Sequence, residues 1–150
     1  MIAETRQLVH DTWALAWPAR DDVARHFYAR LFEIDPDAAR LLTATDMVAQ
    51  RKKFTDMLAA IVGAIDEPDE LVPASSALGR RHAGYSVEDR HYDSVGDALL
   101  WALGQTLGGR YTPEAHAAWH EAYALLSALM RRGALSASGA WTAGREGGAR

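Results

Sequence analysis

Apolar residues recur at intervals of three and four along almost the whole chain, which is the spacing of helices that bury one face. No segment alternates apolar and polar residues cleanly with the two-residue period of a β-strand. The pattern therefore predicts an all-α fold of six or seven helices of unequal length. A plain four-helix bundle would have fewer and more even helices.

Capping residues, prolines and glycines divide this pattern into separate helices. Asp, Ser or Thr before a helix and Gly after it are typical of helix ends. The expected helices are, in order, one over about residues 4–15, one opened by residues 21–22, a short one at 36–41 capped by Asp35, one from Thr45 or Asp46 to about 65, a shorter one from Pro73 to near Gly84, a long one opened by Ser86 and ended by Gly108-Gly109, and a last one begun by Thr112-Pro113.

The chain of 150 residues fits one domain with a self-sufficient core. From Gly133 the sequence turns to Gly, Ala, Ser and Arg, and the helical periodicity fades. We therefore predict a domain over residues 1–132, followed by a mobile tail over residues 133–150.

Composition excludes several classes of function. The net charge is −4, from 16 Lys+Arg against 20 Asp+Glu, and there is no basic recognition helix, which disfavours a DNA-binding regulator. The absence of cysteine excludes disulfide scaffolds, Cys-ligated zinc, iron–sulfur clusters and thiol catalysis. No apolar run approaches the ~20 residues of a membrane span, and no signal-peptide core is found. We expect a cytoplasmic protein with no membrane partner.

Three polar residues, Tyr28, Gln50 and His82, lie where the apolar faces of the helices should form the core. Burying such groups without partners costs about 1–3 kcal/mol each, so they bond to one another or face something polar. A single histidine on a helix face is commonly a satisfied core residue, but imidazole is also a preferred ligand of haem iron. Gln50 and His82 lie on different helices that can face each other across a slot.

Over about residues 5–132, several motifs occur in the order and spacing of one protein family. This stretch resembles a single-domain bacterial globin, close to the haemoglobin domain of flavohaemoglobins. The resemblance rests on FYARLFEIDP at residues 27–36, which resembles the signature FYxxLFxxxP, on residues 47–58 with Gln50 as a distal helix, on LGRRHAG at residues 78–84 as a proximal helix, on YDSVG at residues 92–96, and on Trp119 and Tyr123 in the last helix.

That resemblance implies an all-α globin fold in which the helices sandwich a haem b (iron protoporphyrin IX). It makes His82 the proximal iron ligand, and it matches Tyr28 and Gln50 to the distal pair that hydrogen-bonds bound dioxygen. Phe54, one turn after Gln50, would pack over the haem on the distal side. The alternative for Tyr28 is a core tyrosine with its O–H tied to the backbone.

Other positions are implied by the same resemblance or depart from it. Leu42 aligns with a phenylalanine that stacks on the haem, and it supplies apolar contact without ring stacking. Tyr92 matches the tyrosine of a proximal His–Tyr–Glu set, whereas the Glu position aligns near Ala134, which weakens electron donation toward iron. Lys53 and Arg81 are candidates for binding the haem propionates, and the alternative is that both are solvated surface cations.

The resemblance implies reversible binding of O2, with NO and CO as further ligands, in oxygen transport or in conversion of NO to nitrate. With no reductase domain, a nitric oxide dioxygenase activity needs an external reductase. The competing hypothesis is a globin-like sensor or adaptor, with or without haem, that acts through a protein partner. We expect a monomer or homodimer. His116 and His120 have the spacing of a helical zinc pair but no third ligand, so we expect surface residues.

Overall fold

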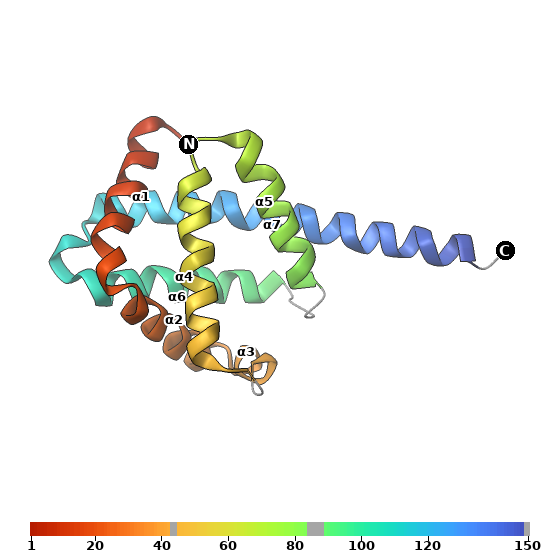
Figure 1. Cartoon of the computed structure of the whole chain (residues 1–150), viewed down its shortest axis with the longest axis horizontal. Coiled ribbons are helices and arrows are strands. Elements are labelled where there is room, and N and C mark those ends of the chain that lie inside the picture. Colours follow the sequence, from red (N-terminus) through yellow and green to blue (C-terminus); the bar gives the residue numbers. More distant parts are fainter. Residues whose placement is uncertain (43–44, 84–88, 149–150) are drawn as a thin grey trace.

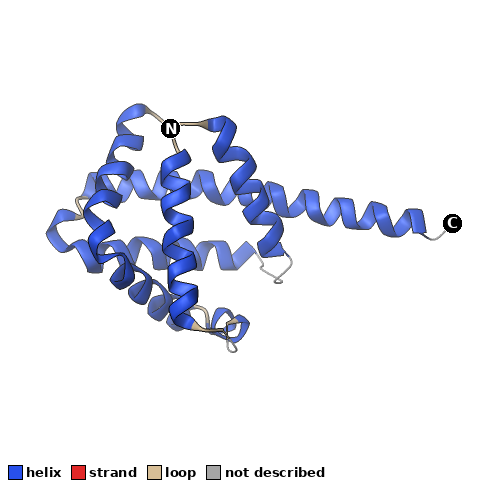
Figure 2. Ribbon diagram, in the orientation of Figure 1, coloured by secondary structure: helices blue, strands red, loops and turns tan. Residues whose placement is uncertain are grey.

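The structure, a computed structural model, describes the backbone of residues 1–42, 45–83 and 89–148, and the side chains of these residues up to 135 except residue 89. Within these ranges there are seven α-helices, two short 3-10 helices and no strand (Figure 2). The all-α prediction is therefore confirmed. The elements are α1 (Ala3–Ala16), η1 (Trp17–Ala19), α2 (Arg20–Ile34), α3 (Pro36–Leu41), α4 (Met47–Ala64), α5 (Pro68–Ala83), α6 (Asp89–Leu107), η2 (Gly108–Arg110) and α7 (Pro113–Gly148).

Several helix ends lie where local sequence signals place them. The Asp46 carboxylate caps α4 by accepting hydrogen bonds from two backbone N–H groups of its first turn. The Thr112 hydroxyl accepts from the backbone N–H of Ala115, 3.1 Å away, at the start of α7. Gly108 ends α6 with a φ of 56°, a backbone conformation that glycine adopts without a side-chain clash. Capping chemistry thus explains these three boundaries.

The start of α5 differs from the prediction. This helix begins at Pro68, and Pro73, the residue expected to precede it, lies inside. Proline is well suited to the first helical position, and Leu71 in the next turn is buried against Leu129 of α7. Burial of this turn therefore extends the helix through Pro73, which has no N–H to give to the carbonyl of Asp69. The capping residue Ser86, expected to open α6, lies outside the described residues.

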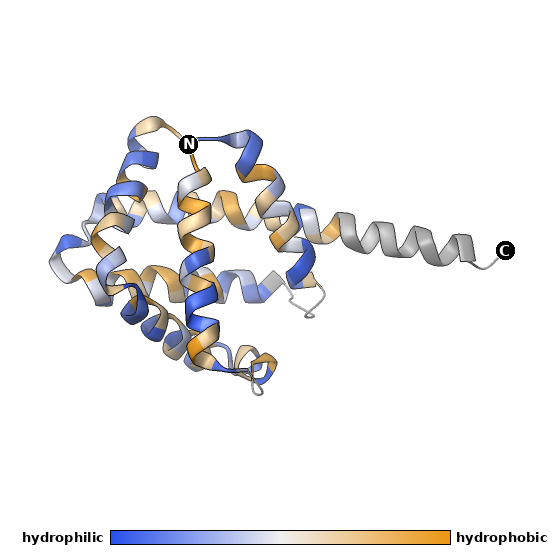
Figure 3. Cartoon of the chain, in the orientation of Figure 1, coloured by the Kyte–Doolittle hydropathy of each residue, from blue (hydrophilic) through white to orange (hydrophobic). Residues whose placement is uncertain are grey.

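Figure 1 shows how the helices are arranged. The helices α6 and α7 run along the long axis of the molecule, while α1, α4 and α5 run across it, and α2 and α3 close one side. Apolar residues gather on the middle stretches of α6 and α7, which the crossing helices cover (Figure 3). The helix α7 continues to Gly148, so its last part extends beyond the rest of the molecule (Figure 1). The mobility predicted for residues 133–150 stays a prediction.

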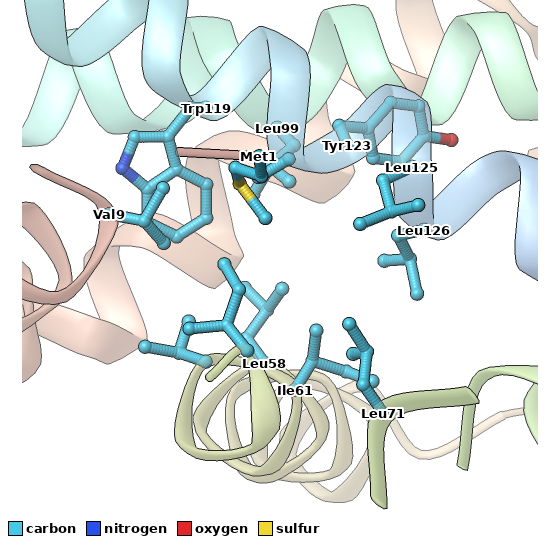
Figure 4. Close-up of a pocket in the computed structure, with 13 residues that line it drawn as sticks. Met1, Val9, Leu58, Ile61, Leu71, Leu99, Trp119, Tyr123, Leu125 and Leu126 are labelled. Carbon is cyan, nitrogen blue, oxygen red and sulfur yellow. The ribbon is translucent and has the colours of Figure 1, made fainter. Parts of the chain in front are cut away.

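The core contains a small apolar cavity of about 30 Å³ between the two sets of helices (Figure 4). Leu58 and Ile61 of α4 lie on one side, and Leu99 of α6 and Trp119 of α7 lie on the other. A cavity of this size with an apolar lining has no polar groups to hold a water molecule. None of the predicted site residues lines it, so the candidate site lies elsewhere in the fold.

Candidate functional site

The first part of the candidate site joins α2 to α4. Gln50 of α4 donates a hydrogen bond from Nε2 to the hydroxyl oxygen of Tyr28 on α2, over 3.0 Å. Tyr28 is buried and Gln50 is half-buried. Two of the three polar residues expected on apolar helix faces therefore form a hydrogen bond with each other. Such a bond offsets the energetic cost of burying them.

Aromatic packing fixes the ring of Tyr28. Phe27 of α2 and Phe54 of α4 stack with ring centroids 4.1 Å apart and an interplanar angle of 14°. The Tyr28 ring meets the Phe54 ring edge to face at 5.7 Å. Such offset and edge-to-face pairs stabilise a defined ring orientation. The phenol oxygen is thus held by rings from both helices as well as by Gln50.

The protonation state of Tyr28 follows from its surroundings. Burial raises the pKa of the phenol, because it disfavours the charged phenolate, while the hydrogen bond from Gln50 acts in the opposite direction. The net shift is upward, so Tyr28 keeps its proton at neutral pH. Because the phenol oxygen accepts from Gln50, the phenol hydrogen remains available to a second acceptor, and so does the other N–H of the amide.

The second part of the site is the last turn of α5, where His82 lies half-buried. Its Nδ1 lies 2.8 Å from the carbonyl oxygen of Leu78, one turn earlier. A carbonyl oxygen can only accept, so Nδ1 carries the hydrogen of that bond. In the neutral imidazole Nε2 then holds the lone pair, which is the form that binds a metal ion. The backbone of α5 therefore sets both the tautomer and the orientation of the ring.

An apolar cluster supports the turn that carries His82. Leu78 packs with Tyr92 of α6 and with Leu126 and Met130 of α7. Tyr92 is buried, and its carbonyl oxygen accepts a hydrogen bond from the hydroxyl of Tyr123. The cluster thus ties α5 to α6 and α7 directly beside the residue whose carbonyl orients His82.

Tyr92 also has a charged neighbour that the sequence did not predict. The guanidinium of Arg131 on α7 lies 5.0 Å from the centroid of the Tyr92 ring, in a cation–π arrangement. The same guanidinium lies 3.5 Å from the carboxylate of Asp93. In the resemblance, the position near Ala134 supplies a carboxylate to this tyrosine. Here a guanidinium lies beside the ring of Tyr92.

The remaining predicted residues lie at the edges of these two clusters. Leu42, at the end of α3, is half-buried and packs against the main core. Lys53 and Arg81 are exposed, and neither forms an ion pair within the described residues. His116 and His120 are exposed on α7, as expected. Solvent-exposed cations suit either of the two alternatives that the sequence left open for Lys53 and Arg81.

One polar cluster was missed by sequence reasoning. Asp35 and His91 are both buried, with His91 Nε2 3.5 Å from Asp35 Oδ2. Asp37 lies beside them, 2.6 Å from Arg90 Nη2, and the ligand atoms of Asp35, Asp37 and His91 all lie within 4.8 Å of one another. Asp35 precedes α3 as predicted, but its side chain makes no capping hydrogen bond. Because 56 residues separate Asp35 from His91, no local spacing could have signalled this pairing.

The fold and these side chains define an all-α protein with an oriented imidazole on one helix and a paired phenol and amide on two others. Comparison with known proteins identifies the class: the globin family matches residues 25–130. The chain therefore belongs to the globin family, and the predicted globin fold is confirmed. Among the described residues, no helix combines the length and apolar character needed to span a bilayer.

Curated relatives refine this assignment. The chain is 30% identical over 155 residues to the Flavohemoprotein of Rhodopirellula baltica, a match that covers 97% of this chain and 38% of that protein. It is 30% identical over 146 residues to the Flavohemoprotein of Xylella fastidiosa strain Temecula1, covering 91% and 36%. It is 25% identical over 126 residues to that of Bacillus subtilis, covering 83% and 32%. The chain thus spans about a third of the length of these relatives, and the predicted resemblance to flavohaemoglobins is confirmed.

Proposed function

We propose that this globin binds haem b through His82 and binds dioxygen reversibly on the side of Tyr28 and Gln50. The observation that carries the proposal is the bond between His82 Nδ1 and the Leu78 carbonyl oxygen, which leaves Nε2 as the lone-pair nitrogen. Histidine ligands of metals commonly donate their other ring N–H to a backbone carbonyl in this way. Relatives named flavohemoproteins support haem as the group that the imidazole would hold.

The chemistry of the residues present fits that group. A neutral imidazole is a preferred axial ligand of haem iron, and the haem would supply the iron atom to which a diatomic gas binds. Phe54 and Leu42 provide apolar side chains for the faces of a flat macrocycle. The exposed cations Lys53 and Arg81 would suit the two negatively charged propionates of a haem.

Tyr28 and Gln50 would stabilise the bound gas. Dioxygen draws electron density when it binds, so a neutral O–H and a neutral N–H directed at it form charge-assisted hydrogen bonds. The raised pKa of Tyr28 keeps the phenol hydrogen in place for this role. The stack of Phe27 on Phe54 and the contact of Phe54 with Tyr28 hold the buried phenol in place.

Two uses follow from reversible O2 binding, and both are proposals for this chain. One is delivery or storage of O2. The other is conversion of NO to nitrate, in which NO, O2 and one electron combine into nitrate. That electron must come from a reductase, because the described helices include no flavin or nicotinamide domain that could supply it.

A sensor or adaptor is the competing function. The observation in its favour is α7, whose last part extends beyond the other helices (Figure 1) and therefore offers a surface to a partner. In this case the ligand site would regulate the partner, and catalysis would not be needed.

Absorption spectra of the ferric, ferrous and ferrous–CO protein test whether the chain binds haem through His82, on which the proposed function rests. We expect the parent to take up haem in a one-to-one ratio and to show a histidine-ligated ferrous form. The variant His82→Ala should lose that form, whereas His120→Ala, a matched change at an exposed histidine of α7, should keep it. An unchanged spectrum in His82→Ala would identify a different axial ligand. A parent that takes up no haem would favour the haem-free adaptor.

A further inference from the structure

Two glycines let the backbones of α5 and α7 touch where these helices cross. A Cβ atom added to Gly79 of α5 would lie 1.9 Å from the carbonyl oxygen of Met130 on α7. A Cβ added to Gly133 of α7 would lie 2.2 Å from the carbonyl oxygen of Ser76 on α5. Both separations are far below van der Waals contact. The contact is reciprocal, because each helix contributes one glycine and, three residues before it, one backbone carbonyl.

Two apolar clusters also join α5 to α7. Leu71 of α5 packs with Leu129 of α7. Leu78 of α5, which precedes Gly79, packs with Leu126 and Met130 of α7. Since backbone already meets backbone at the two glycines, these clusters hold α5 against α7 at the closest approach that the backbones allow.

Steric need, and not backbone conformation, explains the two glycines. Both lie inside helices, where glycine is less favourable than alanine, and neither has a positive φ. Gly63 of α4 offers a contrast, because a Cβ added there would meet nothing within 4 Å. At residues 79 and 133 the gain from glycine is therefore the close approach of the two helices.

The crossing lies directly beside the group that orients His82. Gly79 follows Leu78, whose carbonyl oxygen accepts from His82 Nδ1. Any shift of this turn away from α7 moves the carbonyl and the imidazole together. We propose that Gly79 and Gly133 are positioning residues for His82, because the backbone contact that they permit sets where the imidazole stands. The consequence for haem rests on the proposed function, whereas the contact itself does not.

The test compares Gly79→Ala and Gly133→Ala with two controls, all loaded with haem. Each methyl group must push α5 and α7 apart by about 1 Å, which strains or lengthens the bond from His82 to iron. We expect haem to transfer to apomyoglobin about 10- to 100-fold faster than from the parent. The iron–histidine stretching frequency in the resonance Raman spectrum of the ferrous form should shift as well.

The controls separate position from general stability. Gly63→Ala adds the same methyl group to a helix in open space, so haem loss and the stretching frequency should match the parent. Leu129→Ala weakens the packing between α5 and α7 but inserts no atom between the backbones. It should lower the melting temperature and leave the stretching frequency unchanged. If Leu129→Ala shifts the frequency as the glycine variants do, loss of stability and not position is the cause.

Two results would overturn the inference while leaving the proposed function intact. One is parent-like haem retention and an unshifted frequency in either soluble glycine variant. The other is the absence, in NMR spectra of the haem-loaded parent, of nuclear Overhauser contacts from the Hα atoms of Gly79 to Met130 and of Gly133 to Ser76. The second measurement needs no variant, so the inference is tested even if both substitutions prevent folding. A parent that binds no haem refutes the proposed function separately.

Discussion

Removing the hydroxyl group of Tyr28 tests the distal half of the site most directly. The variant Tyr28→Phe keeps the ring that packs on Phe54 and removes one oxygen atom, the acceptor for Gln50. A hydrogen bond of this kind stabilises the folded protein by about 1 kcal/mol, and Gln50 is half-buried, so its amide can turn toward water. We therefore expect the loss of stability to be about 0.5–1 kcal/mol.

The effect on bound dioxygen should be larger. A hydrogen bond to a group that carries charge is worth about 1.5–3 kcal/mol, twice or more the value for a neutral pair. Since about 1.4 kcal/mol corresponds to a factor of ten, loss of the Tyr28 donor should raise the O2 dissociation rate about 10- to 100-fold. The association rate should change little, because the phenylalanine ring occupies the same space.

Stopped-flow displacement of O2 by CO measures the dissociation rate in the haem-loaded protein. Tyr111→Phe is the matched control: its hydroxyl is buried and has no hydrogen-bond partner among the described residues, and it lies at the end of η2. It should leave the rate at the parent value. An unchanged rate in Tyr28→Phe would show that the phenol does not reach the bound gas. Equal acceleration in both variants would show that the effect is not specific to the site.

Three further predictions concern stability. Val62→Ile adds a methylene group toward the apolar cavity, so it should raise the free energy of unfolding in urea by about 0.8 kcal/mol. Thr112→Ala removes the cap that accepts from Ala115, so it should lower that free energy by about 1 kcal/mol, measured in the same way. Burial raises the pKa of Tyr111 to about 12, whereas a tyrosine in the unfolded chain ionises near 10. Between pH 10 and 12 the unfolded chain therefore loses this proton first, and the free energy of unfolding falls as pH rises. In urea melts at pH 8 and 11, Tyr111→Phe should show a smaller fall than the parent.

Helix positions were predictable wherever the signal lies within a few residues of the helix end. Asp46, Thr112 and Gly108 act through their own side chains or their own φ, so the sequence around each contains the whole explanation. The start of α5 was predicted wrongly because it depends on the burial of Leu71 against Leu129, a residue far along the chain. Local signals cannot weigh a contact between residues that are distant in sequence.

The candidate site could be predicted in part for a related reason. Tyr28, Gln50 and His82 stood out because each places a polar group on an apolar helix face, and the energetic cost of burial demands a partner. Only the structure shows which partners they have: Gln50 bonds to Tyr28, and His82 bonds to the carbonyl oxygen of Leu78.

Other features give no local signal at all. Asp35 and His91 each look like ordinary polar residues in their own segments, and only the fold brings them together. Gly79 and Gly133 look like weak points within helices until the crossing of α5 and α7 is known. The contact of Asp35 with His91 and the close approach of α5 to α7 each depend on two segments that are distant in sequence, so neither can be predicted from one segment alone.

The two halves of the site are held by different parts of the fold. The phenol of Tyr28 is fixed by rings and an amide from α2 and α4, whereas the imidazole of His82 is fixed by the backbone of α5 and its contact with α7. The two halves have separate hydrogen bonds, but Met57 of α4 and Tyr123 of α7 pack against the apolar clusters of both. On the proposed function, a substitution around Tyr28 therefore acts directly on how tightly a gas is held, and it reaches the imidazole of His82 only through this shared apolar packing.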